Sequence, residues 1–359
     1  MLALNLPINT VSFGQVSTAI VRELASRKKD FLFSGVGPID LSAQSEEPEL
    51  KVVLETLNKN FAATHSRENP IFKLWHLSGS LESFSQKQFL LSFYELDSPT
   101  KMELNIVKNN HKVYFSSEEA VNLFKSYGCL NVDYLPLAFD KWNFSETGKK
   151  YFQDGRIVFN LAGKLEKRKH HAKAIRAWIK RFGNNRKYCL QCAVYNPFLK
   201  PEDNNASIKS IVGESKPFNV SFLGFMQKNS MYNDFVNSGD IVLAMSGGEG
   251  WGLPEFQSVC LGKHAVTLYA SGYKGWANDS NSCLVYPSGK TSSVDNMFFR
   301  SGDSTNQGSI YDFNDDEFIA ACEKAISRVE SERVNNAGKE LKDKFSYAKL
   351  VDKLIEDVK

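Results

Sequence analysis

Glycines, one carboxylate and a helix-starting proline stand close together in the segment Ser246–Gln257, which reads Ser-Gly-Gly-Glu-Gly-Trp-Gly-Leu-Pro-Glu-Phe-Gln. Glycine lets the backbone approach a ligand closely and adopt positive φ, and Pro254 suits the first turn of a helix, where its missing N–H costs nothing. The unpaired N–H groups at such a helix start attract an anion. The segment therefore predicts a turn that holds a phosphorylated ligand. The alternative is an ordinary strand-to-helix joint in which the glycines only allow tight packing.

A cluster of cations forms a second such group in the segment Gly163–His171, which reads Gly-Lys-Leu-Glu-Lys-Arg-Lys-His-His. It follows the apolar run 157–162, as the first segment follows the apolar run 240–245. Open α/β sheets bind ligands at the carboxyl ends of their strands. Two ammonium groups there, those of Lys164 and Lys169, can neutralise a diphosphate beside the backbone donors of the glycine-rich turn.

The composition is that of an ordinary globular chain and excludes several classes. Of 359 residues, 42% are apolar and 24% charged, and a net charge of +3 alone does not argue for a nucleic-acid or membrane partner. No run approaches the roughly 18 apolar residues of a membrane span, and the start of the chain lacks the pattern of a signal peptide, so we expect a cytoplasmic protein. A P-loop sequence is absent, and a dinucleotide fingerprint fits the glycine spacing poorly.

Short apolar runs alternate with helix-length amphipathic segments, which is typical of an α/β fold with mostly parallel sheets. We expect strands at 1–6, 30–36, 70–77, 88–95, 111–116, 131–135, 156–162, 187–194, 219–223, 240–245, 264–268 and 282–286. We expect helices near 15–27, 48–62, 117–127, 175–182, 315–331 and 346–357. An interdomain linker is expected at 136–148 and a long irregular loop at 287–312. The predicted parts are a first domain, 1–145, a second domain, 146–340, and a C-terminal helix within 341–359 that packs back on the first domain.

Together the two segments resemble those of retaining nucleotide-sugar glycosyltransferases, above all glycosyltransferase family 4. That family grips the donor diphosphate with a Gly-Arg-Leu-x-x-x-Lys segment, matched here by Gly163, Lys164, Leu165 and Lys169, with lysine in place of arginine. Its Pro-Ser-x-x-Glu-Gly-Phe-Gly-Leu-Pro-x-x-Glu segment corresponds to residues 245–257. The resemblance implies the GT-B architecture: two Rossmann-like domains facing across a cleft, the first on the acceptor side and the second binding the nucleotide sugar.

The resemblance also implies roles for single residues of this sequence. The catalytic candidates are Glu249, under the reacting carbon, and His76, in the cleft. The residues implied for the donor sugar are Glu249, Gly250 and Trp251. Those implied for the donor diphosphate are Lys164, Lys169, Gly14, Gly252 and Leu253. Those implied for the nucleoside are Gln257, Phe225 and Gly224. The acceptor-side candidates, which end an apolar run, are Glu95 and Asp97.

Structural roles are the alternatives for some of these residues: a satisfied structural histidine for His76, and helix-capping carboxylates for Glu95 and Asp97. Gln257 departs from the family pattern, because the family has a glutamate there that accepts from both ribose hydroxyls, whereas an amide has one acceptor oxygen. A weakened charge-assisted bond of this kind costs about 1–2 kcal/mol.

The predicted reaction moves a hexose or similar sugar from a nucleoside diphosphate sugar to a hydroxyl of a glycan, glycolipid or other acceptor, with retention of configuration. The resemblance implies no metal ion and no cofactor, because cations and helix N-termini stabilise the leaving diphosphate. One alternative, suggested by Gln257, is a catalytically silent module that binds a nucleotide sugar. Another rests on the stretch Lys164–Lys187, which has ten Lys or Arg and one acidic residue. In this alternative the stretch contacts a polyanion, so that the acceptor is nucleic acid or a membrane glycolipid. The structural interpretation of the same stretch is a solvated helix face.

Overall fold

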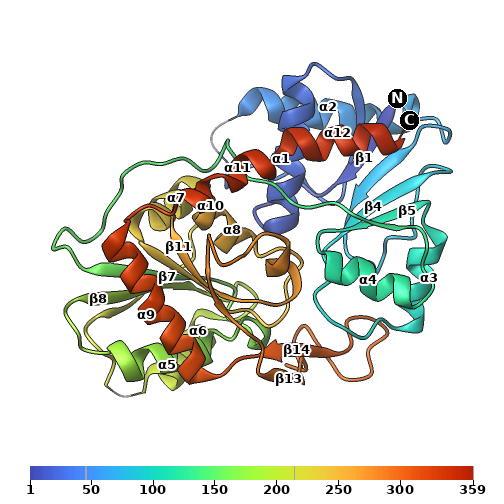
Figure 1. Ribbon diagram of the computed structural model, residues 1–359. Helices are drawn as coiled ribbons and strands as arrows, with labels where there is room; N and C mark the ends of the chain where they lie inside the picture. Colours follow the sequence, from blue (N-terminus) through green and yellow to red (C-terminus); the bar gives the residue numbers. More distant parts are fainter. Residues whose placement is uncertain (45–46, 214, 359) are drawn as a thin grey trace.

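The computed structural model describes residues 1–44, 47–213 and 215–358, which form two parallel β-sheets flanked by helices (Figure 1). The predicted α/β class with two Rossmann-like sheets is confirmed. We call residues 2–134, built on the first sheet, the first half, and residues 157–344, built on the second sheet, the second half.

The first sheet has six parallel strands in the order β2-β1-β3-β4-β5-β6. Its strands are β1 (Leu2–Leu6), β2 (Phe31–Gly35), β3 (Ile71–Leu74), β4 (Gln88–Ser92), β5 (Lys112–Phe115) and β6 (Val132–Tyr134). The helices of this half are α1 (Ser12–Ser26), α2 (Pro48–Thr64), α3 (Lys101–Asn109) and α4 (Glu118–Ser126). Runs such as the Leu-Ala-Leu-Asn-Leu of β1 are nearly all apolar because helices cover both faces of a parallel sheet.

The second sheet also has six parallel strands, in the order β12-β11-β10-β7-β8-β9. Its strands are β7 (Ile157–Gly163), β8 (Tyr188–Val194), β9 (Val220–Phe222), β10 (Ile241–Ala244), β11 (His264–Leu268) and β12 (Cys283–Val285). Its helices are α5 (His171–Phe182), α6 (Pro201–Val212), α7 (Asn229–Ser238), α8 (Leu253–Cys260), α9 (Asp315–Ser331), α10 (Asn336–Lys339) and α11 (Leu341–Lys344), with 3-10 turns η1 (Lys167–Lys169) and η2 (Ser271–Gly275). Because β7 and β10 are neighbours, the cation-rich segment and the glycine-rich turn leave the sheet side by side.

Sequence reasoning missed the four-residue helices α10 and α11 and the longer helices α3, α6 and α7. The last two are rich in Asn and Ser, which favour caps and turns over helix interiors and so obscure the apolar period. Residues 287–312 were expected to be irregular throughout, but they contain an antiparallel hairpin of β13 (Gly289–Ser292) and β14 (Ser309–Asp312). The strands of this hairpin are short, and β13 is exposed and polar, so no alternating pattern marks it.

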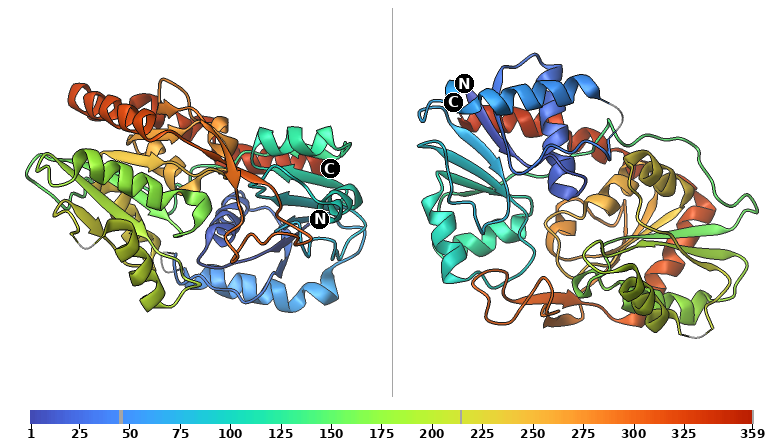
Figure 2. Two further views of the ribbon diagram at one scale, coloured as in Figure 1. Left: turned by 90° about the horizontal axis from the view of Figure 1, so that it is seen from below. Right: turned by 180° about the vertical axis from the view of Figure 1, so that it is seen from behind.

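This hairpin and the loop between its strands, residues 289–312, form a strap that reaches from the second half to the first (Figures 1 and 2). Asp97 receives a hydrogen bond from the backbone N–H of Ser309 at 2.7 Å and an ion pair from Lys290 at 2.7 Å. Phe299 and Ile310 are buried in the apolar core of the first half. The strap therefore packs against the first half and joins it to the second.

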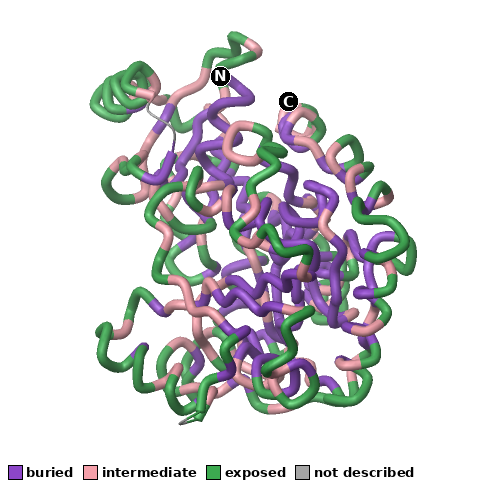
Figure 3. The backbone as a smooth tube through the Cα atoms, turned by 90° about the vertical axis from the view of Figure 1, so that its left-hand side faces the viewer, coloured by how far each residue is buried: buried purple, intermediate pink, exposed green. Residues whose placement is uncertain are grey.

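The C-terminal helix α12 (Tyr347–Val358) crosses back to the first half and lies along α1 (Figure 1). Arg27 donates to the backbone oxygen of Ala348 at 2.8 Å and pairs with Asp352 at 2.5 Å. The apolar face of α12 is buried in one continuous core that includes side chains of both halves. Figure 3 shows buried backbone running through the middle of the molecule. No helix of the described residues is both long and apolar enough to cross a membrane.

Candidate functional site

Two turns at the carboxyl edge of the second sheet lie against each other. The first leaves β7 at Gly163, whose φ of +126° favours glycine, and continues into η1. The second is the glycine-rich turn 246–252, which follows β10. The carbonyl of Arg168 accepts from the N–H of Gly247 at 2.9 Å and from Oγ of Ser246 at 3.2 Å. The two segments singled out in the sequence are therefore bonded into one unit.

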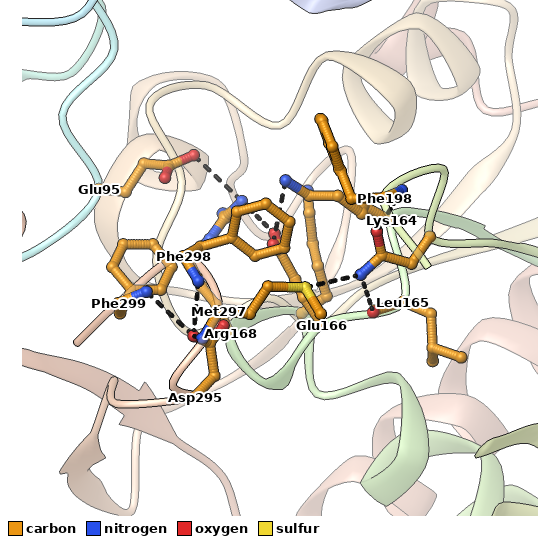
Figure 4. Close-up of polar contacts among 12 residues, drawn as sticks. Glu95, Lys164, Leu165, Glu166, Arg168, Phe198, Asp295, Met297, Phe298 and Phe299 are labelled. Atoms are coloured by element: carbon orange, nitrogen blue, oxygen red, sulfur yellow. Dashed lines mark hydrogen bonds and ion pairs between the residues drawn. The ribbon is translucent and has the colours of Figure 1, made fainter. Parts of the chain in front are cut away.

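Five charged side chains meet in this unit and form an ionic cluster, which consists of Glu95, Glu166, Arg168, Lys169 and Glu249. Arg168 is at its centre: its Nη2 lies 2.6 Å from Glu166 and 3.1 Å from Glu95 (Figure 4). Its Nη1 lies 3.0 Å from Glu249. The ammonium group of Lys169 also contacts Glu249. Arg168, Lys169 and Glu249 are all buried. Buried charges persist in proteins only when they are paired, and here the pairs span the two turns.

The electrostatics keep the Lys169 and Glu249 pair ionised. Burial alone would raise the pKa of Glu249, but the positive charges of Lys169 and Arg168 outweigh it and lower the pKa to about 2. Burial likewise opposes the charge of Lys169, and Glu249 nevertheless raises the pKa of this lysine. At neutral pH Glu249 is therefore ionised beside two charged cations, Lys169 and Arg168.

Part of the glycine-rich turn is packed against the first half of the molecule. A Cβ atom at Gly248 would lie 2.4 Å from the backbone oxygen of Glu95, and one at Gly250 would lie 2.7 Å from Cβ of Phe93. The hydroxyl of Ser116 donates to the carbonyl of Gly250 at 2.8 Å. These two glycines let the halves approach, which supports the packing alternative for this part of the turn.

The end of the turn is a helix start, and backbone N–H groups at a helix start attract anions. Gly252 has a φ of +79°, and a Cβ there would lie 2.2 Å from a ring carbon of Tyr273. Leu253 is the first residue of α8, so its N–H has no acceptor within the helix. Among the predicted phosphate ligands, Gly252 and Leu253 end the turn whose Glu249 contacts Lys169. Gly14 lies in α1, where a Cβ atom would lie 2.1 Å from the backbone oxygen of Asn9.

Lys164 lies at the edge of this unit. Its Nζ is 3.2 Å from Glu166 and 3.7 Å from the centre of the Phe298 ring, which belongs to the strap. The side chain is 29% exposed, compared with 9% for Lys169. The structure thus brings one of the two predicted lysines into contact with Glu249, and the other into contact with the strap.

Two residues assigned to the donor make other contacts. The ring of Trp251 is buried, with Phe256 and Phe345 at centroid distances of 5.3 and 5.1 Å, so it belongs to the apolar core. The amide oxygen of Gln257 accepts from the N–H of Asp140 at 3.2 Å, and its nitrogen donates to Ala138 at 3.4 Å. The amide of Gln257 therefore holds the segment that connects the two halves.

The other predicted residues are spread around the cluster. His76 is exposed, with its ring 4.5 Å from that of Phe13. Gly224 and Phe225 are exposed beyond β9, where Phe225 lies 6.1 Å from the ring of Tyr195. Of the acceptor-side candidates, Glu95 belongs to the ionic cluster and Asp97 holds the strap.

Three charged residues of the unit, Glu166, Arg168 and Glu255, were missed by sequence reasoning as site residues. Arg168 stands at a variable position of the family pattern, between two lysines, so nothing in the sequence distinguished it. Glu255, on α8, is 2% exposed, and the charge of Lys169 acts on its pKa. Only the fold, which brings β7 and β10 together, reveals these contacts.

Space between the halves is small in this conformation. A cavity of about 10 Å³ is lined by Glu95, Asp97, Glu119, Gly247 and Tyr311, and a second of about 10 Å³ is lined by His76 and strap residues. Each has room for about one water molecule. Neither of these two cavities is large enough for a ligand of the size of a nucleotide sugar.

The cations between Lys164 and Lys187 do not form one uniform basic surface. Arg168 and Lys169 are buried in the ionic cluster. Lys173 pairs with Asp312 at 2.8 Å, and Arg181 pairs with Glu323 at 2.7 Å. These pairs reduce the positive charge that a polyanion would meet.

The fold is that of GT-B glycosyltransferases, as the sequence predicted. No protein-family model matches the chain, and no curated protein matches it in sequence. Among solved structures, sucrose-phosphate synthase from Thermosynechococcus elongatus is 12% identical with a TM-score of 0.66, covering 99% of this chain and 98% of that one. Anabaena HepE in complex with UDP-glucose is 13% identical with a TM-score of 0.64, covering 100% and 99%. A glycosyltransferase from Rickettsia africae is 10% identical with a TM-score of 0.68, covering 99% and 97%.

Proposed function

We propose that this chain is a retaining glycosyltransferase that moves a sugar from a nucleoside diphosphate sugar to an acceptor hydroxyl without a metal ion. The observation that carries the proposal is the buried pair of Lys169 and Glu249, beside the start of α8 at the carboxyl edge of the second sheet. The GT-B fold supports the same class of reaction, and the HepE structure with UDP-glucose makes that compound the first donor to test.

In the proposed reaction, Lys169 and the N–H groups of Gly252 and Leu253 neutralise the leaving diphosphate. Glu249 turns from Lys169 to the sugar and, being ionised, stabilises the positive charge that develops on the ring. The bond from the anomeric carbon to the phosphate oxygen breaks, and the acceptor oxygen bonds to that carbon on the same face. The leaving phosphate takes the acceptor proton. Because Lys169, Arg168 and the helix start supply positive charge, the mechanism needs no divalent ion.

The first experiment measures thermal stability of the purified chain with UDP-glucose and with other nucleoside diphosphate sugars. A donor at 100 times its dissociation constant adds about 2.7 kcal/mol to the free energy of unfolding. The selected donor is then incubated with candidate acceptors in EDTA, and NMR of the product reports the anomeric configuration. Absence of any stabilising nucleotide sugar, or a product of inverted configuration, would contradict the proposal.

Glu249→Gln tests the role of the carboxylate while keeping its size. Loss of a preorganised charge that acts on the transition state is expected to lower turnover about 10²–10³-fold. The exposed Glu202 on α6 provides a matched control, and Glu202→Gln is expected to leave turnover unchanged. Unchanged turnover in a folded Glu249→Gln variant would remove this residue from the mechanism.

A catalytically silent module that binds a nucleotide sugar is the second candidate. The position of Gln257 favours it, since both ends of this amide are engaged by residues 138 and 140 and neither is free for a ribose. This candidate predicts that the donor stabilises the chain while hydrolysis and transfer stay undetectable with every acceptor tested.

A further inference from the structure

Lys164, which aligns with the diphosphate-binding arginine of family 4, is engaged by the strap. Its ammonium group lies 3.7 Å from the ring centre of Phe298 and 5.4 Å from that of Phe198. Asp295 fixes this part of the strap, because its carboxylate accepts from three successive backbone N–H groups at 2.9 Å each. Figure 4 shows Lys164 among these aromatic side chains. A cation–π contact of this kind and the ion pair to Glu166 compete with any role of Lys164 toward a phosphate.

Arg168 points into the ionic cluster. It is 5% exposed, its Nη1 lies 3.0 Å from Glu249, and it donates to the carbonyl of Gly248 in the glycine-rich turn. Among the described residues, its Nε has no hydrogen-bond partner. A guanidinium group presents its N–H donors in a planar fork that matches two phosphate oxygens, which an ammonium group does not. Arg168 thus has the position and the chemistry of a phosphate ligand.

The three carboxylates on Arg168 differ in how firmly they are held. Glu166 and Glu249 belong to the same half as Arg168, lie 2.6 and 3.0 Å from it, and have side chains that are 2% and 8% exposed. Glu95 comes from the first half, lies 3.1 Å away and is 29% exposed. Burial raises the pKa of Glu95, although the charge of Arg168 opposes the rise. Glu95 is therefore the carboxylate that another anion replaces with the least disturbance of buried charge.

We propose that Arg168, together with Lys169, binds the diphosphate of the donor, and that the phosphate replaces Glu95 on the guanidinium group. The inference rests on the proposed function, since it assumes a nucleoside diphosphate ligand. It assigns to Arg168 the task that the family pattern gives to the position of Lys164. It also links donor binding to the contact between the halves, because the Glu95 pair is one of the bonds across their interface.

Affinity measurements with UDP, GDP and ADP, each beside its own nucleoside, test the inference. Arg168→Ala is expected to raise the dissociation constant of the bound diphosphate about tenfold to a hundredfold, as loss of a charged hydrogen-bond partner does. Arg168→Lys, which keeps the charge and protects folding, is expected to fall in between. Lys164→Ala is expected to weaken binding less than either. Glu95→Gln, which removes the competing charge, is expected to tighten binding about threefold or more, while the affinity for the nucleoside stays the same in every variant.

Arg156→Ala is the matched control, because Arg156 precedes β7 at the opposite edge of the same sheet and pairs with the exposed Asp154. Its affinity for the diphosphate is expected to equal that of the wild type. If the wild type binds none of the three diphosphates, the proposed function fails. If the wild type binds one, and Arg168→Lys keeps the affinity or Glu95→Gln weakens it, the inference about Arg168 alone is wrong.

Discussion

The buried carboxylates near Lys169 differ in whether an opposite charge compensates for their burial. Glu249 contacts both Lys169 and Arg168, and its pKa is about 2. Glu255 is buried equally well, but among the described residues its Oε2 has no hydrogen-bond partner. Burial raises the pKa of Glu255 to about 7, with Lys169 opposing the rise. The pKa of Glu249, on the turn, thus lies below the ordinary value of a glutamate, and the pKa of Glu255, on α8, lies above it.

Glu255 makes stability depend on pH. Its carboxyl binds a proton more tightly in the folded chain, with a pKa of about 7, than in the unfolded chain, with an ordinary value of 4.5. Its contribution is therefore fully present below pH 4.5 and is lost as the pH rises to about 7. Glu255→Gln removes this loss. As the pH rises from 5 to 8, the free energy of unfolding of the variant should therefore increase relative to that of the wild type by on the order of 3 kcal/mol. Urea unfolding at both pH values measures the gain, and the exposed Glu356→Gln should show none.

The roles of individual residues could be predicted from the sequence only where a pattern fixes them locally. The segments around Lys169 and Glu249 were found because glycines, cations and a helix start follow apolar runs. The contact between these residues needs the strand order, which places β7 beside β10. Arg168 and Glu95 come from segments that are distant in sequence, and no local pattern records that they meet.

Among the elements, the strap shows most clearly what local sequence does not encode. Its strands pair in register from Gly289 with Asp312 to Ser292 with Ser309, yet they are too short and too exposed to produce an alternating pattern. Its place is decided by contacts with the first half, such as Thr100, whose hydroxyl donates to the carbonyl of Ser304 at 2.6 Å. By contrast, the strands of both sheets were predicted because they are buried on two faces and nearly all apolar.

Asp97→Asn tests whether the strap depends on its contacts with the first half. The change removes the charge that pairs with Lys290 and weakens the bond from the N–H of Ser309. Because the pair is partly exposed, we expect a loss of only about 1 kcal/mol in local stability, seen as faster amide hydrogen exchange in residues 293–309. Asp303→Asn, in an exposed part of the same loop, is the control and should leave exchange unchanged. Equal exchange in both variants would mean that the strap does not depend on its contacts with Asp97.

At the scale of the whole molecule, the segment between the two sheets, the strap and α12 all join the halves, in addition to direct contacts such as the pair of Arg168 and Glu95. The largest apolar cluster includes Leu4 and Phe72 of the first half, Phe256 of the second, and Leu354 of α12. A shared core couples the two sheets more strongly than surface contacts alone.

Leu354→Ala tests whether α12 makes the two halves one unfolding unit. Leu354 is fully buried in the shared core, so its truncation is expected to lower the free energy of unfolding by about 3 kcal/mol. We expect the whole molecule to unfold as one unit. Circular dichroism and tryptophan fluorescence should therefore report one transition at a lower denaturant concentration. Glu356→Ala, on the exposed face of the same helix, should leave the midpoint unchanged. Two separate transitions, with only one shifted, would show instead that the halves unfold independently and that α12 stabilises the first half alone.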